Sequence, residues 1–332
     1  MSSVKSWLKN HLSDDAQHLL RRAVSWPPII DFPPDLARTV FLASPGRSGS
    51  GWVANIINYK NDYRYIYEPF NPIQQIASPG FSVGRYLRPD DRDPTLLKVA
   101  GRLLTGRMGY NRLLDVDNKR FIASRRLIKE VSANLWLKWL HANFPEVKIV
   151  LLFRHPCAVV CSRIRHNNPV YFKPYLDQPD LMADFLAPFK SELERASSGD
   201  DWDQRMFAWC IQHYVPLRQF AKGEIHLAFY ENFAENPKEE IVRLFSFLGK
   251  KFDDEVFAAI KRPSFVTRPG APILTGQSVV ASWKKDMTEQ RARRALEITS
   301  LFGLDTIYGT DPMPNIKAAY AQLGADKSTV LH

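Results

Sequence analysis

The sequence of 332 residues has only three cysteines and no long apolar run. Cys157, Cys161 and Cys210 are too few for a disulfide framework, and no Cys-x-x-Cys pair suggests a zinc site. No window holds about 18 uninterrupted apolar residues, and the first residues lack the apolar block and cleavage site of a signal peptide. These absences predict a cytoplasmic protein without disulfides or a transmembrane helix.

Acidic residues are fewer than basic ones. The 45 Lys and Arg against 35 Asp and Glu give a formal net charge of +10 at pH 7. An excess of positive charge favours anionic partners. Because the cations are dispersed along the chain and form no long basic tract, the sequence favours a small anionic ligand and predicts no nucleic-acid partner.

Residues 1–35 are predicted to form an amphipathic helix followed by a proline-rich linker. Within residues 4–23, apolar side chains recur at steps of three and four, the spacing of one helix face. Four basic side chains in the same segment are compatible with peripheral contact at the inner surface of a membrane. The apolar positions are Val4, Trp7, Leu8, Leu12, Ala16, Leu19 and Ala23.

Further along the chain, a strand, a turn and a helix follow one another three times. This rhythm predicts an α/β fold with a mostly parallel sheet flanked by helices. Residues 73–120 and 167–205 lack the rhythm, and we expect them to be insertions over the carboxyl edge of the sheet, where such sheets bind ligands. They belong to a main domain over 36–310, which is followed by a C-terminal tail, 311–332. The predicted strand and helix pairs are 39–44 with 52–59, 148–153 with 156–165, and 225–230 with 237–248.

The strongest local motif is the Gly- and Ser-rich turn at 44–52, between the first strand and its helix. Glycines let several backbone N–H groups converge on one anion, and a helix N-terminus adds partial positive charge. Trp52 and Val53 stand where a nucleoside triphosphate-binding P-loop has Lys and Ser or Thr. The usual Mg²⁺-binding hydroxyl is therefore missing, which disfavours a nucleotide kinase and predicts no metal. Arg47 supplies a cation inside the loop.

Two further segments follow the second and third strands. Arg154 directly follows a strand, and Ser162 lies eight residues later in the next helix. A guanidinium can bind phosphate through two hydrogen bonds, and a hydroxyl can donate one more. Tyr230 ends the third strand and begins the sequence Tyr-Glu-Asn.

These three segments together resemble PAPS-dependent sulfotransferases, where PAPS is 3′-phosphoadenosine 5′-phosphosulfate. The turn at 44–52 is similar to their phosphosulfate loop, Arg154 and Ser162 keep the spacing of their 3′-phosphate motif, and residues 225–249 are similar to their strand, Tyr-Glu-Asp loop and helix. The resemblance implies a P-loop-kinase-like sulfotransferase fold, PAPS as the donor and PAP, its desulfated form, as the product. The cofactor-binding residues that it implies are Gly46, Arg47, Ser48, Gly49, Ser50, Gly51, Trp52, Arg154, Ser162 and Tyr230.

The resemblance has one clear departure near the C-terminal end. Residues 276–278 are Gly-Gln-Ser, where the family has an Arg-Lys-Gly triplet that holds the 3′-phosphate. Residues 281–284, Ala-Ser-Trp-Lys, resemble the Gly-Asp-Trp-Lys segment that follows. Arg268 and Lys284 are the candidates to replace the missing phosphate contact.

Three residues are predicted to carry the transfer itself. Arg47 and Lys129 are candidate cations for the leaving group, by analogy with loose phosphoryl transfer. Val131 stands where the cytosolic enzymes have their histidine base, and Glu68, in a Glu-Pro element like that of carbohydrate-type enzymes, is the proposed general base. A role for Glu68 only as the partner of an arginine stays open. The fallback bases are His155, His166 and Glu130.

The predicted function is transfer of a sulfuryl group from PAPS to a hydroxyl of a sugar, polysaccharide or glycolipid. A lipid or a small phenol or alcohol is the alternative acceptor. A nucleotide kinase and a non-catalytic nucleotide- or membrane-binding module are the alternatives of other classes. Neither the acceptor nor the oligomeric state follows from the sequence.

Overall fold

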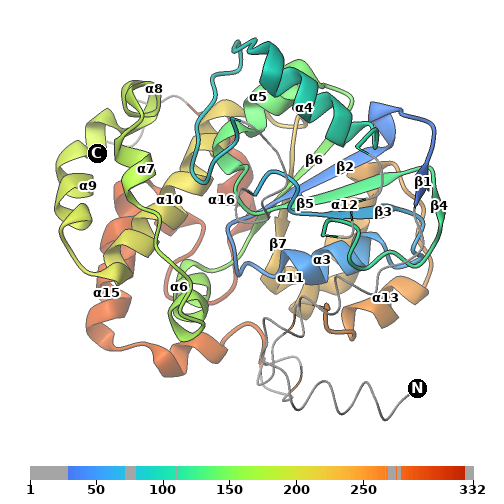
Figure 1. The fold of residues 1–332 in the computed structure, drawn as a ribbon. Helices are drawn as coiled ribbons and strands as arrows, with labels where there is room; N and C mark the ends of the chain where they lie inside the picture. Colours follow the sequence, from blue (N-terminus) through green and yellow to red (C-terminus); the bar gives the residue numbers. More distant parts are fainter. Residues whose placement is uncertain are drawn as a thin grey trace, which may run out of the picture.

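The computed structural model describes residues 29–71, 80–108, 111, 113–265, 267, 274 and 278–325. Its centre is a five-stranded sheet in the order β3-β5-β2-β6-β7, and every neighbouring pair of strands is parallel (Figure 1). The chain enters at the central strand, moves to one edge and returns to build the other. The strands are β2 Thr39–Ala43, β3 Arg64–Tyr67, β5 Arg126–Glu130, β6 Lys148–Phe153 and β7 His226–Phe229.

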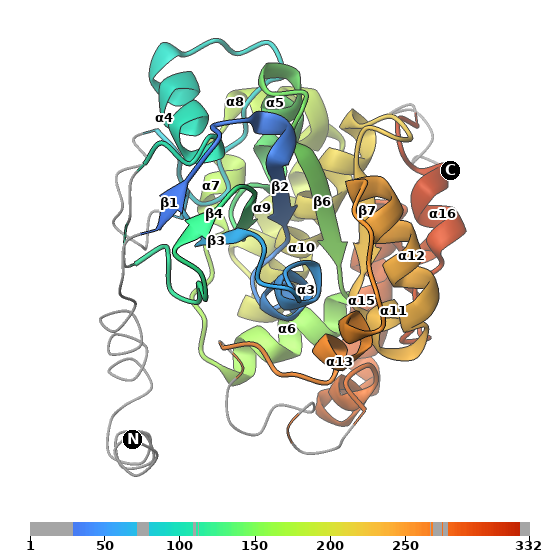
Figure 2. The ribbon, with the colours of Figure 1, turned by 90° about the vertical axis from the view of Figure 1, so that its right-hand side faces the viewer.

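Helices cover both faces of this sheet because alternate strand residues point to opposite sides. In β2, Val40 and Leu42 belong to the apolar cluster under α3, α12 and α13, whereas Phe41 and Ala43 belong to the cluster under α4, α5 and α10. Figure 2 shows the two layers from the side. The sequence prediction of a mostly parallel sheet flanked by helices is confirmed. These helices are α3 Ser50–Ile57, α4 Pro94–Leu104, α5 Leu137–Asn143, α10 Asp201–Gln219, α12 Pro237–Leu248 and α13 Glu255–Ile260.

Smaller elements complete the described part of the chain. Two short strands, β1 and β4, form a separate parallel pair. Within the described ranges, no helix is long and apolar enough to cross a membrane. The remaining strands and α-helices are β1 Ile30–Asp31, β4 Ile122–Ala123, α6 Pro156–Arg165, α7 Lys173–Leu176, α8 Pro179–Leu181, α9 Lys190–Ser197, α11 Tyr230–Glu235, α15 Glu289–Leu301 and α16 Ile316–Ala321.

Two strands of the sheet, β3 and β5, were not among the three predicted repeats. Each begins with an arginine, Arg64 or Arg126, that is at most 1% exposed. Both guanidiniums are buried because acidic side chains pair with them: Asp115 binds Arg64, and Asp31 contacts both. A buried parallel strand is normally recognised by a continuous apolar run, and a charged first residue interrupts that run. Burial of the charge is costly unless a tertiary partner of opposite charge pairs with it.

The expected place of the first insertion, 73–120, was wrong for part of its length. Thr39 Oγ1, at the start of β2, donates a hydrogen bond to Leu104 O at 2.7 Å, and Asp115 binds Arg64 at the start of β3. Leu104 and Asp115 therefore lie at the amino edge of the sheet. The predicted helix at 4–23 lies outside the described residues.

Candidate active site

The loop between β2 and α3 has the geometry of an anion-binding turn. β2 ends at Ala43 and α3 begins at Ser50, so six residues lead directly into the first turn of the helix. Gly49, the N-cap, has φ 87°, in the left-handed region that glycine adopts without steric cost. The free N–H groups at the start of α3 therefore face the loop and favour an anion there.

The hydroxyl groups of this loop also indicate a ligand. Ser44 and Ser48 are fully buried, and neither Oγ has a hydrogen-bond partner among the described residues. Buried polar groups are normally hydrogen-bonded, so two orphaned hydroxyls in one loop require an explanation. A Cβ added at Gly46 would meet nothing within 4 Å, which leaves open space on that side of the loop.

Gly49 is also the point at which the third motif packs onto the first. A Cβ built at Gly49 would lie 2.4 Å from the ring of Tyr230, so no larger residue fits without displacing the tyrosine. The ring of Tyr230 meets Trp52 edge-on, with centroids 5.0 Å apart. The Trp52 indole N–H donates to Ile260 O at 2.9 Å, which ties this aromatic pair to α13.

Arg154 connects the second motif to the other two. It directly follows β6, and its Nη1 donates a hydrogen bond to Arg47 O at 3.1 Å. Its guanidinium carbon lies 4.1 Å from the centre of the Tyr230 ring, a cation–π distance. Arg154 Nε is buried and has no hydrogen-bond partner in the part of the chain that the structure describes. The guanidinium is held in place by its neighbours but keeps a donor without an acceptor.

The side chain of Arg47 turns toward the same place. Its Nε donates to Ser162 Oγ, on α6, at 3.2 Å. Arg47, Arg154 and Ser162 thus form one group, in which cationic and hydroxyl donors gather beside the aromatic pair. The structure brings together residues that lie more than 100 positions apart in the sequence.

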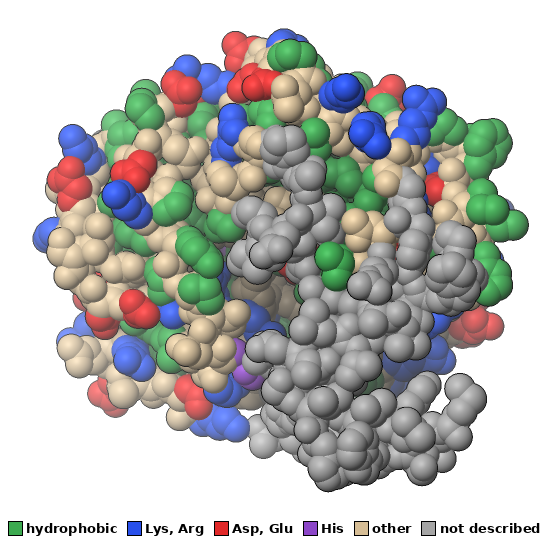
Figure 3. Space-filling view, in the orientation of Figure 1, with side chains coloured by type: hydrophobic (Ala, Val, Ile, Leu, Met, Phe, Trp, Pro, Cys, Tyr) green, Lys and Arg blue, Asp and Glu red, His purple; other side chains and the backbone are tan. Residues whose placement is uncertain are grey.

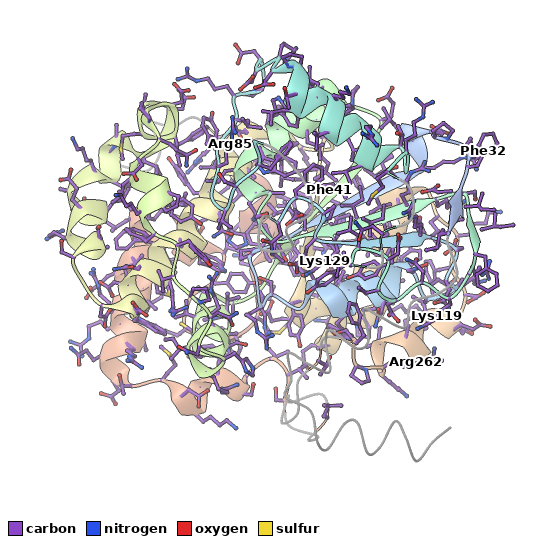
Figure 4. The ribbon with its side chains drawn as sticks, viewed as in Figure 1. Phe32, Phe41, Arg85, Lys119, Lys129 and Arg262 are labelled. Carbon is purple, nitrogen blue, oxygen red and sulfur yellow. The ribbon has the colours of Figure 1, made fainter. Side chains whose placement is uncertain are left out.

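A second group forms where β3 and β5 end. The register of these strands pairs Tyr67 with Lys129, and Glu68 N donates to Lys129 O at 2.7 Å. The Lys129 ammonium forms an ion pair with Glu68 Oε1, and the two side chains are only 5% and 8% exposed. Asn71 Nδ2 donates to the other oxygen, Glu68 Oε2, at 2.8 Å. Figure 4 shows Lys129 near the centre of the molecule.

Both members of this pair are ionised at neutral pH. Burial by itself raises the pKa of the Glu68 carboxyl and lowers that of the Lys129 ammonium. The charge of each partner and the hydrogen bonds around the pair act in the opposite direction and together outweigh burial. The pKa of Glu68 is therefore below its ordinary value, and the pKa of Lys129 is above its own.

The backbone is strained at both groups. Among the described residues other than glycine, four have positive φ, and two of them are asparagines, which tolerate this region. The other two are Arg47, with φ 75°, and Glu68, with φ 48°. Such strain persists only where the surrounding structure enforces it, and it clusters at functional sites.

Glu130 supports the second group from within the protein. It is fully buried, and its carboxylate accepts hydrogen bonds from Phe70 N at 2.8 Å, Val131 N at 2.8 Å and the Ser132 hydroxyl at 2.9 Å. It thereby joins the turn that contains Glu68 to the end of β5. Burial, followed by the charge of Glu68, raises the pKa of Glu130 to about 7.

His155 and Glu231 have equivalent supporting positions at the first group. Glu231 accepts hydrogen bonds from His155 N and from the Tyr308 hydroxyl, both at 2.8 Å. The His155 ring stacks on Trp283 at 4.2 Å, its Nδ1 accepts from Cys157 N, and its Nε2 contacts Gly309 O. Burial lowers the pKa of His155 to about 4. With both ring nitrogens engaged, His155 has no free position to act as a base.

Comparison with known proteins places this arrangement in a family. A model of the sulfotransferase domain matches residues 37–300, which contain both groups of side chains. The chain belongs to the sulfotransferase family. Within the described ranges, no three His, Cys, Asp or Glu side chains gather as a metal site would require.

Two curated relatives of this sulfotransferase are distant ones. It is 24% identical over 292 residues to the nodulation protein NoeE of Sinorhizobium fredii, an alignment that covers 80% of this chain and 64% of that protein. It is 25% identical over 158 residues to sulfotransferase 1E1 of Bos taurus, which covers 47% of each chain. The chain thus spans less than two thirds of the length of both relatives.

Solved structures with similar folds include two sulfotransferase domains. That of the Synechococcus PCC 7002 olefin synthase has 16% identity and a TM-score of 0.44, with 82% of this chain and 95% of that one covered. That of the curacin biosynthetic pathway has 14% identity and a TM-score of 0.41, with 79% and 96% covered. Mouse sulfotransferase SULT7A1, solved with PAP, has 16% identity and a TM-score of 0.37, with 85% and 87% covered.

The predicted site residues of this sulfotransferase fall into two groups. The loop at 46–52, Arg154, Ser162 and Tyr230 form the first, and Glu68 and Lys129 form the second. Arg47, predicted as a catalytic cation, contacts Ser162 in the first group. The roles of these residues remain predictions.

Near the C-terminal departure from the family pattern, only part of the chain is described. Val279 O accepts a hydrogen bond from Arg154 Nη2 at 3.4 Å, and Trp283 stacks on the next residue, His155. The segment at 279–284 therefore does lie against the first group. Arg268 and the residues at 276–277 are outside the described residues.

Sequence reasoning did not find two supporting contacts. Asn71 binds Glu68, and its position three residues later in the same turn was the available signal. Ile260 contributes a backbone carbonyl to Trp52, which no side-chain pattern can indicate.

Proposed function

We propose that this chain transfers a sulfuryl group from PAPS to an acceptor hydroxyl. The first group of side chains holds the donor: the loop at 46–52 binds the 5′-phosphosulfate, Arg154 and Ser162 bind the 3′-phosphate, and Trp52 with Tyr230 lies against the adenine. In the second group, Glu68 serves the acceptor hydroxyl and Lys129 serves the leaving group.

One observation supports this proposal above the others. Arg154, from the end of β6, contacts both the backbone of the glycine-rich loop and the ring of Tyr230, so three motifs with no sequence continuity meet at one place. An adenosine that bears phosphate groups at two positions requires such an arrangement. Cations and amides serve its anionic ends, and an aromatic surface serves its base.

The residues present also fit this donor in detail. Ser48 Oγ and Arg154 Nε are buried donors that have no acceptor within the described ranges, and phosphate oxygens are strong acceptors. The space beside Gly46 lets an anion approach the loop amides closely. Trp52 stands where a nucleoside triphosphatase has its lysine, so a donor that needs no Mg²⁺ suits the loop better than ATP.

The second group supplies a base and a cation at adjacent positions. The Glu68 carboxylate is ionised and can accept a proton from the acceptor hydroxyl, although a lowered pKa makes it a weak base. Lys129 remains a cation, which stabilises negative charge that develops on the leaving group during transfer. Arg47 adds charge on the donor side. A purely ionic role for Glu68, as the partner of Lys129, is the alternative that mutation resolves.

The acceptor is proposed to be a hydroxyl of a sugar, polysaccharide or glycolipid. The Glu-Pro element at Glu68, in place of the histidine base of the cytosolic enzymes, favours this class over a small phenol. A lipid alcohol is the second candidate, since residues 4–23 have the pattern of a membrane-surface helix. Under either acceptor, we place the protein in the cytoplasm, with peripheral contact at the inner membrane surface.

Two measurements test the proposal. PAP or PAPS should raise the melting temperature of the chain, whereas ATP with Mg²⁺ should not, because bound ligand stabilises only the folded state. Radiolabelled sulfate should then pass from PAPS to a member of a panel of sugars, glycolipids and phenols. Stabilisation by ATP–Mg²⁺ alone would favour a kinase, and PAP binding without transfer to any acceptor would favour a non-catalytic module.

A further inference from the structure

The short ribbon made of β1 and β4 has two very different faces. Asp31, at the second position of β1, turns inward and pairs with Arg126 and Arg64. The residues on either side of it, Ile30 and Phe32, therefore turn outward, and they are 62% and 69% exposed. The ion pairs on the inner face fix which side chains the ribbon presents to solvent.

The second strand continues this apolar outer face. Ile122 pairs in register with Ile30 and is 69% exposed, and its neighbour Phe121 is 58% exposed. Four large apolar side chains thus lie on one small ribbon, which we call the ribbon patch: Ile30, Phe32, Phe121 and Ile122. In Figure 3, hydrophobic side chains gather at the right-hand edge of the molecule, the side on which Figure 4 shows Phe32 pointing away from the body.

Basic side chains border the ribbon patch. Lys119 and Arg120 immediately precede Phe121, and Arg125 follows Ile122 by three residues. Lys60 joins them because the Arg120 guanidinium donates to Lys60 O at 3.1 Å. Lys60, Lys119 and Arg125 have exposed side chains paired with surface carboxylates, and such pairs contribute little and exchange readily for other anions.

We propose that the ribbon patch is a membrane-contact surface that places its four apolar side chains among the headgroups of an anionic bilayer. Apolar side chains ringed by lysine and arginine match such a surface, since the rings enter the interface while the cations meet lipid phosphates. The inference does not depend on the proposed enzymatic reaction. It adds a second contact to the one expected from residues 4–23, which precede the patch in the chain.

Charge favours an anionic lipid surface over two other possible partners of the ribbon patch, the segment 4–23 and a second copy of the chain. The segment 4–23 has four Lys or Arg and only two Asp, so its own charge has the same sign as that of the patch border, and an anionic surface attracts both. A second copy of the chain, docked patch to patch, would bring two basic borders together. Both of these arrangements would bring positive charges close to one another, whereas an anionic lipid surface would bring negative charge to the basic border.

Vesicle sedimentation tests the proposal on the full chain. Wild-type protein should sediment with vesicles of phosphatidylcholine containing about one third phosphatidylglycerol, and much less with pure phosphatidylcholine or at high salt. The double variant Phe32→Ser, Ile122→Ser should reduce the partition coefficient by about tenfold or more. The matched control is Ile164→Ser, Tyr171→Ser, which removes one aliphatic and one aromatic side chain, 39% and 41% exposed, from another part of the surface. Its partition should equal that of the wild type.

Three results would overturn the proposal. Equal partition of the patch variant and the wild type would mean that the ribbon does not touch lipid. Complete loss of binding on deletion of residues 1–25, with the patch intact, would assign the contact to that segment alone. If analytical ultracentrifugation showed a dimer for the wild type and a monomer for the patch variant, the ribbon would be a subunit interface. The melting temperature of each variant, with and without PAP, confirms that it remains folded.

Discussion

Charged side chains lie at both edges of the sheet, but the arginines at the two edges have different kinds of partner. At the amino edge, Arg64 forms two hydrogen bonds of 2.8 Å with Asp115, and Arg126 pairs with Asp31. At the carboxyl edge, Arg154 makes contact only with backbone carbonyls and an aromatic ring among its described partners, and its Nε is orphaned.

This difference separates structural charge from functional charge. At the amino edge, Arg64 is buried and matched by a carboxylate, so it is complete without a ligand, and loss of its partner should affect stability. Arg154 is only partly buried, and its described contacts are with backbone carbonyls and an aromatic ring, so it can still bind an anion from outside, and its removal should affect binding. The carboxyl edge also has the strained residues Arg47 and Glu68, which the amino edge lacks among the residues described.

The largest expected effect is at the amino edge. Asp115→Ala leaves Arg64 buried without its main partner, and should lower the free energy of unfolding by about 3–5 kcal/mol. Urea denaturation measures this loss, and the affinity of the folded fraction for PAP should not change. The control, Asp253→Ala, breaks a half-exposed pair with Lys60 and should cost much less than Asp115→Ala, because exposed ion pairs contribute little to stability. Equal losses in both variants would contradict the comparison.

At the carboxyl edge, Glu68→Gln should act on turnover. Loss of the general base should reduce kcat by about 10²-fold or more, because the acceptor proton has no carboxylate to receive it. The dissociation constant for PAP, measured by calorimetry, should stay within a few-fold of wild type. Near-normal turnover would leave Glu68 only as the ionic partner of Lys129.

Arg154→Ala should act on donor binding. Loss of a charged hydrogen-bonding group should raise the dissociation constant for PAP by roughly 10- to 100-fold, with little change in melting temperature without ligand. Arg165→Ala, a half-exposed arginine on α6 that pairs with Asp286, is the matched control and should leave PAP binding unchanged. If both variants bound PAP like the wild type, the second motif would not be a donor site.

A further effect should be a pH dependence at Glu130. Its pKa rises from the ordinary 4.5 to about 7 on folding, so its contribution to stability is complete below about pH 4.5 and is lost as pH rises through 7. The free energy of unfolding of the wild type should therefore fall, relative to that of Glu130→Gln, between about pH 5 and pH 8. Parallel pH curves for the two proteins would show that Glu130 does not titrate in this range.

Much of the fold could be predicted because apolar runs indicate buried strands and helices, and glycines indicate the turns between them. The strand at 148–153 and the helices at 156–165 and 237–248 have the predicted bounds, and β2 differs by one residue. β3 could not be predicted in the same way, since its first residue is an arginine that becomes buried only through Asp115. The local sequence shows which residue types are present, but it does not show which distant residue will pair with them.

The candidate site likewise has features that could be predicted from the sequence and features that depend on tertiary contacts. The residues of the first group were predicted from motifs, and Arg154 and Gly49 both lie against Tyr230. Their roles stay predictions. The sequence indicated that Glu68 would lie near cations but did not identify Lys129 as its partner, since this depends on the register of β3 against β5. The supporting roles of Glu130 and His155 likewise depend on which backbone groups face them.

The sequence by itself determined the residue types, the glycine-rich turn and the order of strand and helix, because these depend on local backbone freedom and on the spacing of apolar side chains. The tertiary structure alone decided which buried charges are neutralised and which stay available. That outcome depends on distances between residues far apart in the chain, such as Arg64 to Asp115 and Arg154 to Arg47. In a medium of low polarity, a few ångströms decide whether a charge is satisfied or needs a ligand.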